Sequence, residues 1–531
     1  MAATVTPPRQ APRIPDVLDV REPSWLERLP TWLTTGVILA VLVAFSAYLR
    51  TRFISGQFWM DEAISTGIAS HPLGQIPGVL RQDGSPPLYY LLLHFWIQAF
   101  GASESATHAL SLMFGLLTIP IGMWGGWTLF GRRAGVMAGI LFASSAFLTL
   151  YAQETRMYEL MGLLGLVATV AFMKAFVDRR RGYLVLFAVA EALMLYTHGW
   201  GIFFGVGAAL ALIPIWRSSD DRRGVVRDAV LAFAGAAILF APWIPNFLYQ
   251  ATHTGAPWAP PPRLGAPILI SRDLLGGDRI TIPLLIAVVI GLGPFASRRY
   301  RHLREATMLW TLITLAVATL LVAWLASHVT PAFVSRYFAP VLASLLLLAA
   351  WGCARSGIAG WVVIFFSVFF VLHVSAYSHP NKSNMREIAG ELAPMLSRGD
   401  LVISGQPEEV PLAWYYLPDG LRYASTLGAV SDPRHMDWVD ALKRLQNANP
   451  QATLKPLLAT LKPGQRLLFV RPLTQGVHNW ESSWTQLVRR RSAQWGAILS
   501  SDPHLKLIAW GPHSFVSGCC VDNSAVLYQD R

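Results

Sequence analysis

The sequence predicts a polytopic α-helical membrane protein with a small α/β domain at its C-terminal end. Of its 531 residues, 53% are hydrophobic and only 14% are charged, whereas soluble domains carry about 25% charged residues. The mean hydropathy is +0.42. Apolar runs recur from residue 31 to about residue 378, and residues 380–531 have an ordinary soluble composition. This change in composition predicts a membrane part followed by a separate domain.

A transmembrane helix needs about 20 predominantly apolar residues, and eleven runs are predicted as spans. They are residues 31–49, 105–129, 134–152, 158–177, 183–198, 201–216, 225–244, 281–296, 306–327, 337–353 and 358–377. Thirty polar, basic, proline-rich residues precede the first run, and no convincing cleavage site follows it. The first run is therefore predicted to be a retained signal anchor with a cytoplasmic N-terminus.

The apolar stretch Leu88 to Phe100 is ambiguous, because a helix of this length is only about 20 Å long, against a hydrocarbon core of about 30 Å. Its Tyr, His and Trp side chains suit the membrane interface. If it lies along the outer leaflet, every arginine cluster falls on the cytoplasmic side, as the positive-inside bias requires. Those clusters are Arg132-Arg133, Arg179-Arg180-Arg181, Arg222-Arg223-Arg227, Arg298-Arg299-Arg301-Arg304 and Arg355.

These assignments divide the chain into three parts. Residues 1–30 are predicted as a cytoplasmic tail, and residues 31–378 as the membrane domain with its first extracytoplasmic loop at 50–104. Residues 379–531 are predicted as an extracytoplasmic α/β domain that acts as a lid or scaffold, or recognises an acceptor. Short strands are expected at 401–404, 466–470, 506–510 and 525–528, and helices at 385–397, 436–446 and 480–499.

Several functional classes are disfavoured by the sequence. The net charge of +12 comes from short clusters between apolar runs, so no nucleic-acid surface is predicted. Neither a G-x-x-x-x-G-K-[ST] phosphate loop nor an H-E-x-x-H zinc helix occurs. The three cysteines, Cys353, Cys519 and Cys520, do not predict a disulfide framework, and a ring between the last two is left open.

Four polar stretches punctuate the apolar sequence, and all four emerge on one side of the membrane in this topology. They are residues 59–62, 83–90, 153–158 and 336–337. Asp61 and Glu62 follow Phe58-Trp59-Met60, which places the acid pair at the interface, where desolvation raises a carboxyl pKa toward the range of a general base. A solvated surface pair is the alternative interpretation.

Glu154 and Arg156 lie between two apolar spans, and ionisable groups at the edge of the hydrocarbon tend to mark function. The guanidinium fork of Arg156 matches phosphate oxygens, although such an arginine could also reach lipid phosphate. Arg336 opens a span from outside as a second cation that could stabilise a leaving group, or as a topological anchor.

Two further residues on the same face are candidates for the site. His198 lies in a Tyr-Thr-His-Gly-Trp turn and could meet a phosphate. Asp83 precedes Gly84-Ser85-Pro86-Pro87, where the prolines stiffen the chain, and an ordinary turn aspartate is its alternative.

In this order, the acid pair, the Asp-x-x-Pro-Pro-Leu-Tyr-Tyr segment at 83–90 and the Glu-x-Arg-Met-Tyr loop at 154–158 resemble the GT-C glycosyltransferases. The resemblance covers about residues 31–350. It is to the family-39 type, which contains protein O-mannosyltransferases, the lipid A aminoarabinose transferase and bacterial relatives that use polyprenyl-phosphate sugars. It implies a GT-C fold of about 11 transmembrane helices in the plasma (inner) membrane.

The resemblance also implies roles for individual residues. Asp61, Glu62 and Glu154 would be catalytic, with Asp61 taking the proton of the acceptor hydroxyl. Arg156 would bind the donor phosphate, with support from Arg336. Apart from the resemblance, His198 is a further candidate for binding the donor phosphate, and Asp83, Tyr158 and Tyr337 are candidates for the substrate pocket. Relatives often carry His or Lys where this chain has Ser85, which argues against the lipid A branch. Some relatives bind a divalent metal near the acids, so the need for a metal near Asp61 is left open.

The expected activity is transfer of a hexose or pentose, with inversion, from a polyprenyl-phosphate donor to an extracytoplasmic glycolipid, polysaccharide or protein of the cell envelope. A lipid or sugar-lipid transporter is one alternative, although internal repeats expected of such a protein are not evident. A membrane-anchored sensor that acts through its C-terminal domain is another. Deleting residues 380–531 would abolish a sensor's function and is expected to leave a transferase with its donor site.

Overall fold

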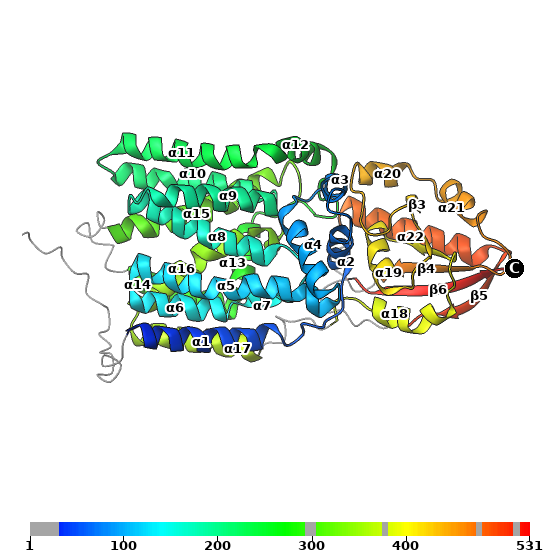
Figure 1. Ribbon diagram of the computed structural model, residues 1–531, viewed down its shortest axis with the longest axis horizontal. Coiled ribbons are helices and arrows are strands. Elements are labelled where there is room, and N and C mark those ends of the chain that lie inside the picture. Colours follow the sequence, from blue (N-terminus) through cyan, green and yellow to red (C-terminus); the bar gives the residue numbers. More distant parts are fainter. Residues whose placement is uncertain (1–30, 293–303, 374–380, 474–480, 513–520) are drawn as a thin grey trace, which may run out of the picture.

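The computed structural model describes residues 31–292, 304–373, 381–473, 481–512 and 521–531. It is an elongated molecule with a helical bundle at one end, a mixed sheet with its helices at the other, and short helices between them (Figure 1). The predictions for the N-terminal tail, for Arg298, Arg299 and Arg301, and for Cys519 and Cys520 lie outside the described residues. Cys353 is buried and free.

Seven helices among the described residues are long and apolar enough to cross a membrane. They are α1 (Thr31–Arg50), α5 (Glu104–Phe130), α8 (Tyr158–Phe172) with its continuation η2 (Met173–Val177), α10 (Gly201–Ser218), α11 (Arg222–Phe240) with α12 (Ile244–His253), α15 (Arg304–Ala326), and η6 (Ser335–Phe338) with α16 (Ala339–Arg355). An eighth arises if α13 (Ala266–Leu275) and α14 (Asp278–Leu292), which meet at 94°, form one bent span.

The remaining predicted runs are also helical, but their helices are shorter. They are α6 (Arg132–Ala143) with α7 (Ala146–Tyr151), α9 (Gly182–Thr197) and α17 (Ile358–His373). The run 134–152 is broken because Ser145 caps a new helix, its Oγ accepting a hydrogen bond from the Leu148 amide at 3.4 Å. Within the described residues, helices therefore occupy every predicted run, and a multi-pass membrane protein is confirmed. Residues 293–296 and 374–377 of the predicted runs lie outside the described residues.

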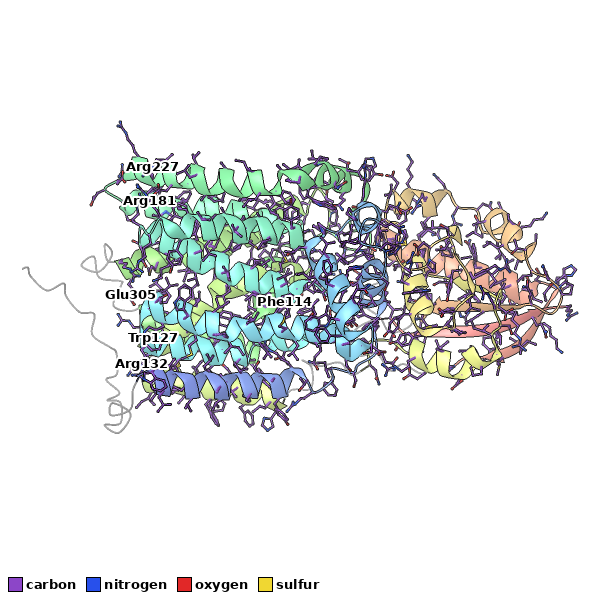
Figure 2. All side chains as sticks on the ribbon, in the orientation of Figure 1. Phe114, Trp127, Arg132, Arg181, Arg227 and Glu305 are labelled. Atoms are coloured by element: carbon purple, nitrogen blue, oxygen red, sulfur yellow. The ribbon has the colours of Figure 1, made fainter. Side chains whose placement is uncertain are left out.

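The short helices α2 (Met60–Ala69), α3 (Ile76–Asp83) and α4 (Leu88–Phe100) lie between the bundle and the sheet (Figure 1). Figure 2 places Arg132, Arg181 and Arg227 at the opposite end of the bundle. The structure thus separates the arginine turns from the polar first loop, as the interfacial placement of Leu88–Phe100 requires.

The C-terminal sheet has the order β3-β2-β1-β4-β6-β5. Strand β1 (Leu401–Ser404) pairs in parallel with β2 (Arg422–Ser425) and β4 (Arg466–Pro472), and the other pairs are antiparallel. The other strands are β3 (Gly428–Val430), β5 (Leu505–Trp510) and β6 (Asn523–Asp530). The four predicted strands are present, and β2 and β3 were not foreseen.

Helices cover both faces of this sheet, which follows from the alternation of side chains along its strands. Val402 and Leu468 face α18 (Met385–Leu392) and α19 (Val410–Tyr416). Leu401 and Phe469 face α21 (Pro450–Leu458) and α22 (Ser483–Ser501). A further helix, α20 (Ala441–Asn447), occupies only part of the predicted 436–446 helix.

The sheet domain is held against the segment between α1 and α5 by hydrogen bonds between distant parts of the chain. The Phe58 amide donates to the Tyr416 hydroxyl at 2.9 Å, and the Trp438 amide donates to the Gln82 carbonyl at 3.0 Å. Phe58 is also part of the apolar cluster under α18 and α19. The loop that carries the acid pair is therefore enclosed between the two halves of the molecule.

Candidate functional site

Helix α2 places the two adjacent acids on different sides. Its first turn is capped by Glu62, whose Oε2 accepts from the Trp59 amide at 3.3 Å. Successive residues on an α-helix point about 100° apart, so Asp61 and Glu62 cannot face the same neighbours. Asp61 is 21% exposed and Glu62 is fully buried.

Asp61 lies between two guanidinium groups from distant segments. Its Oδ2 is 3.9 Å from Nη2 of Arg156 and 3.8 Å from Nη2 of Arg336. Arg156 is held by α2 itself, because its Nη1 donates to the Asp61 carbonyl at 3.2 Å and to Ser65 Oγ at 2.9 Å. An acid and two cations thus converge as the sequence predicted.

Aromatic rings hold the second cation in place. The Arg336 guanidinium lies 5.1 Å from the Trp258 ring centre and 5.6 Å from that of Trp59. Cation–π contacts of this kind orient a guanidinium without satisfying its hydrogen-bond donors. Arg336 can therefore still donate to an anion.

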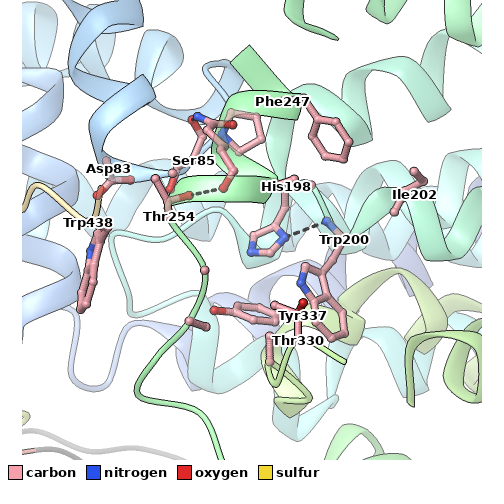
Figure 3. Close-up of a pocket in the computed structure, with 18 of the residues that line it drawn as sticks. Asp83, Ser85, His198, Trp200, Ile202, Phe247, Thr254, Thr330, Tyr337 and Trp438 are labelled. Carbon is pink, nitrogen blue, oxygen red and sulfur yellow. Dashed lines mark hydrogen bonds between the residues drawn. The ribbon is translucent and has the colours of Figure 1, made fainter. Parts of the chain in front are cut away.

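A cavity of about 590 Å³ opens beside this cluster. Figure 3 shows its wall, built from the segment between α1 and α5, the turn after α9, the α12 segment, the turn before α16 and Trp438 of the sheet domain. Asp61 and Arg156 line it together with apolar side chains such as Ile202, Phe203 and Phe247. The cavity therefore combines a charged centre with an apolar wall, as a site for an amphipathic ligand requires.

His198 follows the last residue of α9 and faces the cavity next to Tyr337, their ring centres 4.5 Å apart (Figure 3). Its Nδ1 accepts a hydrogen bond from the Trp200 amide at 3.1 Å. Burial, together with Arg156 and Arg336, lowers the pKa of His198 to about 3. The ring is therefore neutral at physiological pH and keeps its proton on Nε2, which can donate to an anion.

Asp83 also lines the cavity, one residue before Gly84, whose φ of +96° ends α3 in the left-handed region. A Cβ at Gly84 would approach Thr254 Oγ1 to 2.6 Å. This close approach brings the Asp83 turn against the loop after α12. Burial raises the pKa of Asp83 to about 6, although Ser85 and Arg156 oppose the shift.

Glu62 does not line the cavity and is instead fully bonded inside the protein. Its carboxylate is 2.7 Å from Lys382 Nζ and 2.6 Å from His108 Nε2, and it accepts from the Thr155 amide at 2.8 Å. Burial alone would raise the pKa of Glu62, but Lys382 and His108 lower it to about 2. Glu62 therefore ties α2 to the loop of Glu154 and to the start of the C-terminal domain.

Glu154 is buried beside this network, and one of its carboxylate oxygens has no hydrogen-bond partner. Burial raises its pKa to about 7, with Glu62 and Asp61 adding to the shift and Lys382 and Arg336 opposing it. Lys382 also donates to the adjacent Gln153 carbonyl at 2.8 Å. Glu154 thus lies behind the cavity wall, on the Glu62 side of the cluster.

The predicted site residues therefore form two groups. The cavity is lined by Asp61, Asp83, Arg156, His198 and Tyr337, and Arg336 contacts the lining residues Asp61 and Trp258. The second group lies behind the cavity wall and consists of Glu62, Glu154 and Tyr158.

Sequence reasoning missed Lys382, His108, Trp258 and Trp438. Lys382 stands alone between Pro380-Asn381 and Ser383-Asn384 after the last span, and His108 lies within an apolar span. Neither pattern distinguishes them from ordinary loop and core residues.

Two solved structures share this fold over nearly the whole chain. The structure of ArnT from Cupriavidus metallidurans bound to undecaprenyl phosphate has a TM-score of 0.58 at 13% identity, covering 94% of this chain and 98% of that one. The Archaeoglobus fulgidus oligosaccharyltransferase in its apo form has a TM-score of 0.56 at 11% identity, covering 93% of this chain and 75% of that one. No protein-family model matches the sequence, and no curated protein matches it.

The fold is that of the GT-C glycosyltransferases, with a small sheet domain at the C-terminus. The resemblance seen in the sequence motifs is thereby confirmed at the level of the fold.

Proposed function

We propose that this chain is a membrane glycosyltransferase that moves a sugar from a polyprenyl-phosphate donor to an acceptor, with inversion at the anomeric carbon. The observation that carries the proposal is the position of Asp61 between Arg156 and Arg336 at the wall of the cavity. One carboxylate and two guanidiniums supply the base and the phosphate counter-charge that such a displacement needs. A GT-C neighbour that is bound to undecaprenyl phosphate supports this donor class.

In the proposed step, Asp61 accepts the proton of the acceptor hydroxyl as its oxygen attacks the anomeric carbon. The new carbon–oxygen bond forms on the face opposite the donor phosphate, and the bond to the phosphate breaks. The phosphate oxygen leaves with the electron pair, and its charge is stabilised by Arg156 and Arg336. Nε2 of His198 donates a further hydrogen bond to the phosphate.

Glu62 is a positioning residue in this proposal, because its ion pair with Lys382 fixes the first turn of α2 and hence the place of Asp61. Glu154 and Tyr158 support the same wall, the Tyr158 hydroxyl accepting from Arg156 Nη2 at 3.4 Å. Asp83 and Tyr337 line the space for the sugar.

The proposed orientation puts the N-terminus in the cytoplasm and the sheet domain outside the plasma membrane, with the arginine turns on the cytoplasmic side. The donor then enters the cavity from the bilayer along its apolar wall. The acceptor approaches beneath the sheet domain, from which Trp438 reaches the cavity.

The experiment is a donor panel on the full-length protein in liposomes. Polyprenyl phosphates carrying hexoses or pentoses are supplied with cell-envelope extracts as acceptors, and release of polyprenyl phosphate is measured. The proposal expects release with at least one donor, coupled to one new glycoside in the extract. Activity only with water-soluble nucleotide sugars would contradict it.

A further inference from the structure

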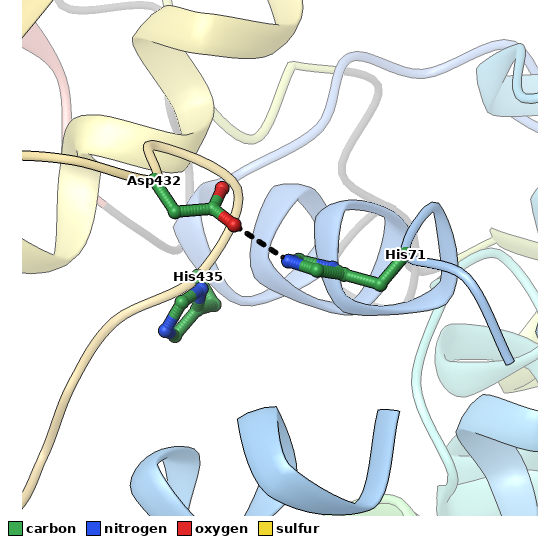
Figure 4. Close-up of side chains that lie close together, drawn as sticks. All are labelled: His71, Asp432 and His435. Atoms are coloured by element: carbon green, nitrogen blue, oxygen red, sulfur yellow. Dashed lines mark hydrogen bonds and ion pairs between the residues drawn. The ribbon is translucent and has the colours of Figure 1, made fainter. Parts of the chain in front are cut away.

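A second cluster of functional side chains lies at the junction of the two halves of the molecule, away from the cavity. It contains His71, just beyond the end of α2, and Asp432 and His435 from the loop between β3 and α20. Figure 4 shows the three side chains converging from these segments. One ligand atom from each residue lies within 4.8 Å of the other two. Among the described residues, these three form a group of His and Asp side chains close enough together to hold a metal ion.

His71 is buried and its ring orientation is fixed by the backbone. Its Nδ1 is 2.9 Å from the Gly67 carbonyl, which can only accept, so Nδ1 carries the hydrogen. In the neutral ring Nε2 then directs its lone pair at Asp432 Oδ2, only 2.7 Å away. A cation bound between these two atoms converts their repulsion into coordination. A carbonyl behind a ligating imidazole is the usual support of a metal-bound histidine.

His435 completes the set with an unused nitrogen. Its Nε2 is 3.1 Å from Gln82 Oε1 and donates to it, so Nδ1 presents a lone pair. Nδ1 of His435 is buried and has no hydrogen-bond partner. The rings of His71 and His435 are 5.6 Å apart, centre to centre. Nδ1 of His435 therefore lies close to His71 Nε2 and Asp432 Oδ2.

Asp432 is oriented by Arg434, whose Nε and Nη2 each donate to the carboxylate at 2.8 Å. Ligating carboxylates are commonly hydrogen-bonded in this way. Oδ2 retains a lone pair for a further ligand contact.

We propose that His71, Asp432 and His435 bind a divalent transition-metal ion of the zinc class. Two imidazole nitrogens and one carboxylate oxygen are ligands that Zn²⁺ accepts at about 2.0–2.2 Å, which sets tetrahedral ligand atoms about 3.3 Å apart. Small side-chain movements would bring His71 Nε2, Asp432 Oδ2 and His435 Nδ1 to this tetrahedral spacing. A cavity of about 230 Å³, lined by Asp432 and His435, has room for a water molecule as the fourth ligand.

The ion would fasten the sheet domain to the helix that carries Asp61. His71 lies ten residues after Asp61, which corresponds to about 15 Å along a helix axis. At this separation the ion takes no part in the transfer chemistry. The loop is already pressed against α2, because a Cβ on Gly67 would come within 1.9 Å of the Arg434 carbonyl oxygen. The same loop leads to Trp438, which lines the larger cavity. The site is thus a structural clasp, independent of the proposed function.

The test is direct metal binding by the full-length protein, purified in detergent with a tag that contains no histidine. Protein is loaded with Co²⁺ or Zn²⁺, desalted, and its metal content measured by mass spectrometry, with the visible absorption of Co²⁺ as a report on nitrogen ligands. One ion per chain is expected in the wild type and in the control His504→Ala, which removes an exposed histidine of the same domain. His71→Ala and His435→Ala are expected to lose it.

A second variant tests metal binding without removing a ligand, so that a loss of metal cannot be attributed to misfolding. Gln82→Ala keeps all three ligands and removes only the support of His435, so metal affinity should fall about 10–100-fold while the elution profile stays unchanged. Metal should also slow hydrogen exchange in residues 431–438. The proposal is overturned if the wild type retains no metal, which would leave His71 and Asp432 as a plain ion pair, or if His71→Ala and His435→Ala retain as much metal as His504→Ala.

Discussion

Asp61 and Glu62 are adjacent in the sequence, yet their carboxylates serve different parts of the protein. Asp61 faces the cavity between Arg156 and Arg336, whereas Glu62 is buried against Lys382 and His108. The buried ion pair fixes the helical turn from which the partly exposed Asp61 projects. In the proposed mechanism, the two acids therefore act as one unit, with Asp61 as the base and Glu62 as the positioning residue.

Removing either guanidinium should impair departure of the donor phosphate. Arg156→Ala and Arg336→Ala are each expected to lower kcat about 10²–10³-fold, by analogy with the loss of one charge-stabilising donor. Arg336→Lys keeps the charge but not the forked geometry, so it should fall between the wild type and Arg336→Ala. Steady-state kinetics with a fixed donor measure this, and wild-type kcat in both alanine variants would place the phosphate elsewhere.

The Glu62–Lys382 pair should appear as strong coupling in stability. Glu62→Gln leaves Lys382 charged in a buried site, which is expected to cost about 3–5 kcal/mol. The double variant Glu62→Gln, Lys382→Met should lose less than the sum of the two single variants, because no unpaired charge remains. Thermal melting in detergent measures all three. Strictly additive losses would show that the two groups do not interact.

Glu154 should make the protein less stable as the pH rises. Its pKa is raised from 4.5 to about 7 in the folded state, so the folded protein binds more protons than the unfolded chain between these values. By linkage, stability falls as the pH increases through this window. Glu154→Gln removes this titrating group. The difference between the melting temperature of the variant and that of the wild type should therefore be more positive at pH 8 than at pH 5. A difference that is constant with pH would contradict the raised pKa.

The contact between α2 and the loop 431–438 can be tested at Gly67. The Cβ of Gly67→Ala would collide with the Arg434 carbonyl, and overpacking of this kind costs about 1–3 kcal/mol. Gly78→Ala is a matched control, since nothing lies within 4 Å of a Cβ there. Only Gly67→Ala should increase proteolytic cleavage within residues 431–438. Equal cleavage of both variants would contradict the close docking.

A divalent metal near Asp61 is open to a direct test. Two guanidiniums within 4 Å of Asp61 repel a cation at the same carboxylate, so we expect sugar transfer to persist after chelation. The His71→Ala variant is the protein to use, because the clasp ion then does not complicate the result. Loss of transfer on chelation, restored by Mg²⁺ or Mn²⁺, would show that a metal binds near Asp61.

The sequence predicted the parts of the fold that depend on local patterns. Apolar run length located the helices, and the arginine turns fixed the placement of Leu88–Phe100. Short apolar runs identified β1, β4, β5 and β6, whereas β2 (Arg-Tyr-Ala-Ser) and β3 (Gly-Ala-Val) contain too few large apolar residues to carry such a signal. The 94° bend between α13 and α14 depends on packing, which hydropathy does not encode.

The site was predictable only where polar residues interrupt apolar runs. Asp61, Arg156 and Arg336 stood out for that reason, and the structure brings them together. The sequence did not reveal Lys382, or the cluster of His71, Asp432 and His435. These are isolated residues in the sequence, and they meet their partners only through tertiary contacts. For the same reason, deletion of residues 380–531 is a poorer test than the sequence suggested, since it removes Lys382 from Glu62.

The most direct measurement of the central claim is sugar transfer by Asp61→Asn in liposomes, with a polyprenyl-phosphate donor that the wild type uses. Loss of a general base should slow transfer about 10²–10⁴-fold while membrane insertion and donor binding remain. Asp221→Asn, at the helix cap on the arginine side, is the control and should behave as wild type. Undiminished transfer by Asp61→Asn would contradict the account.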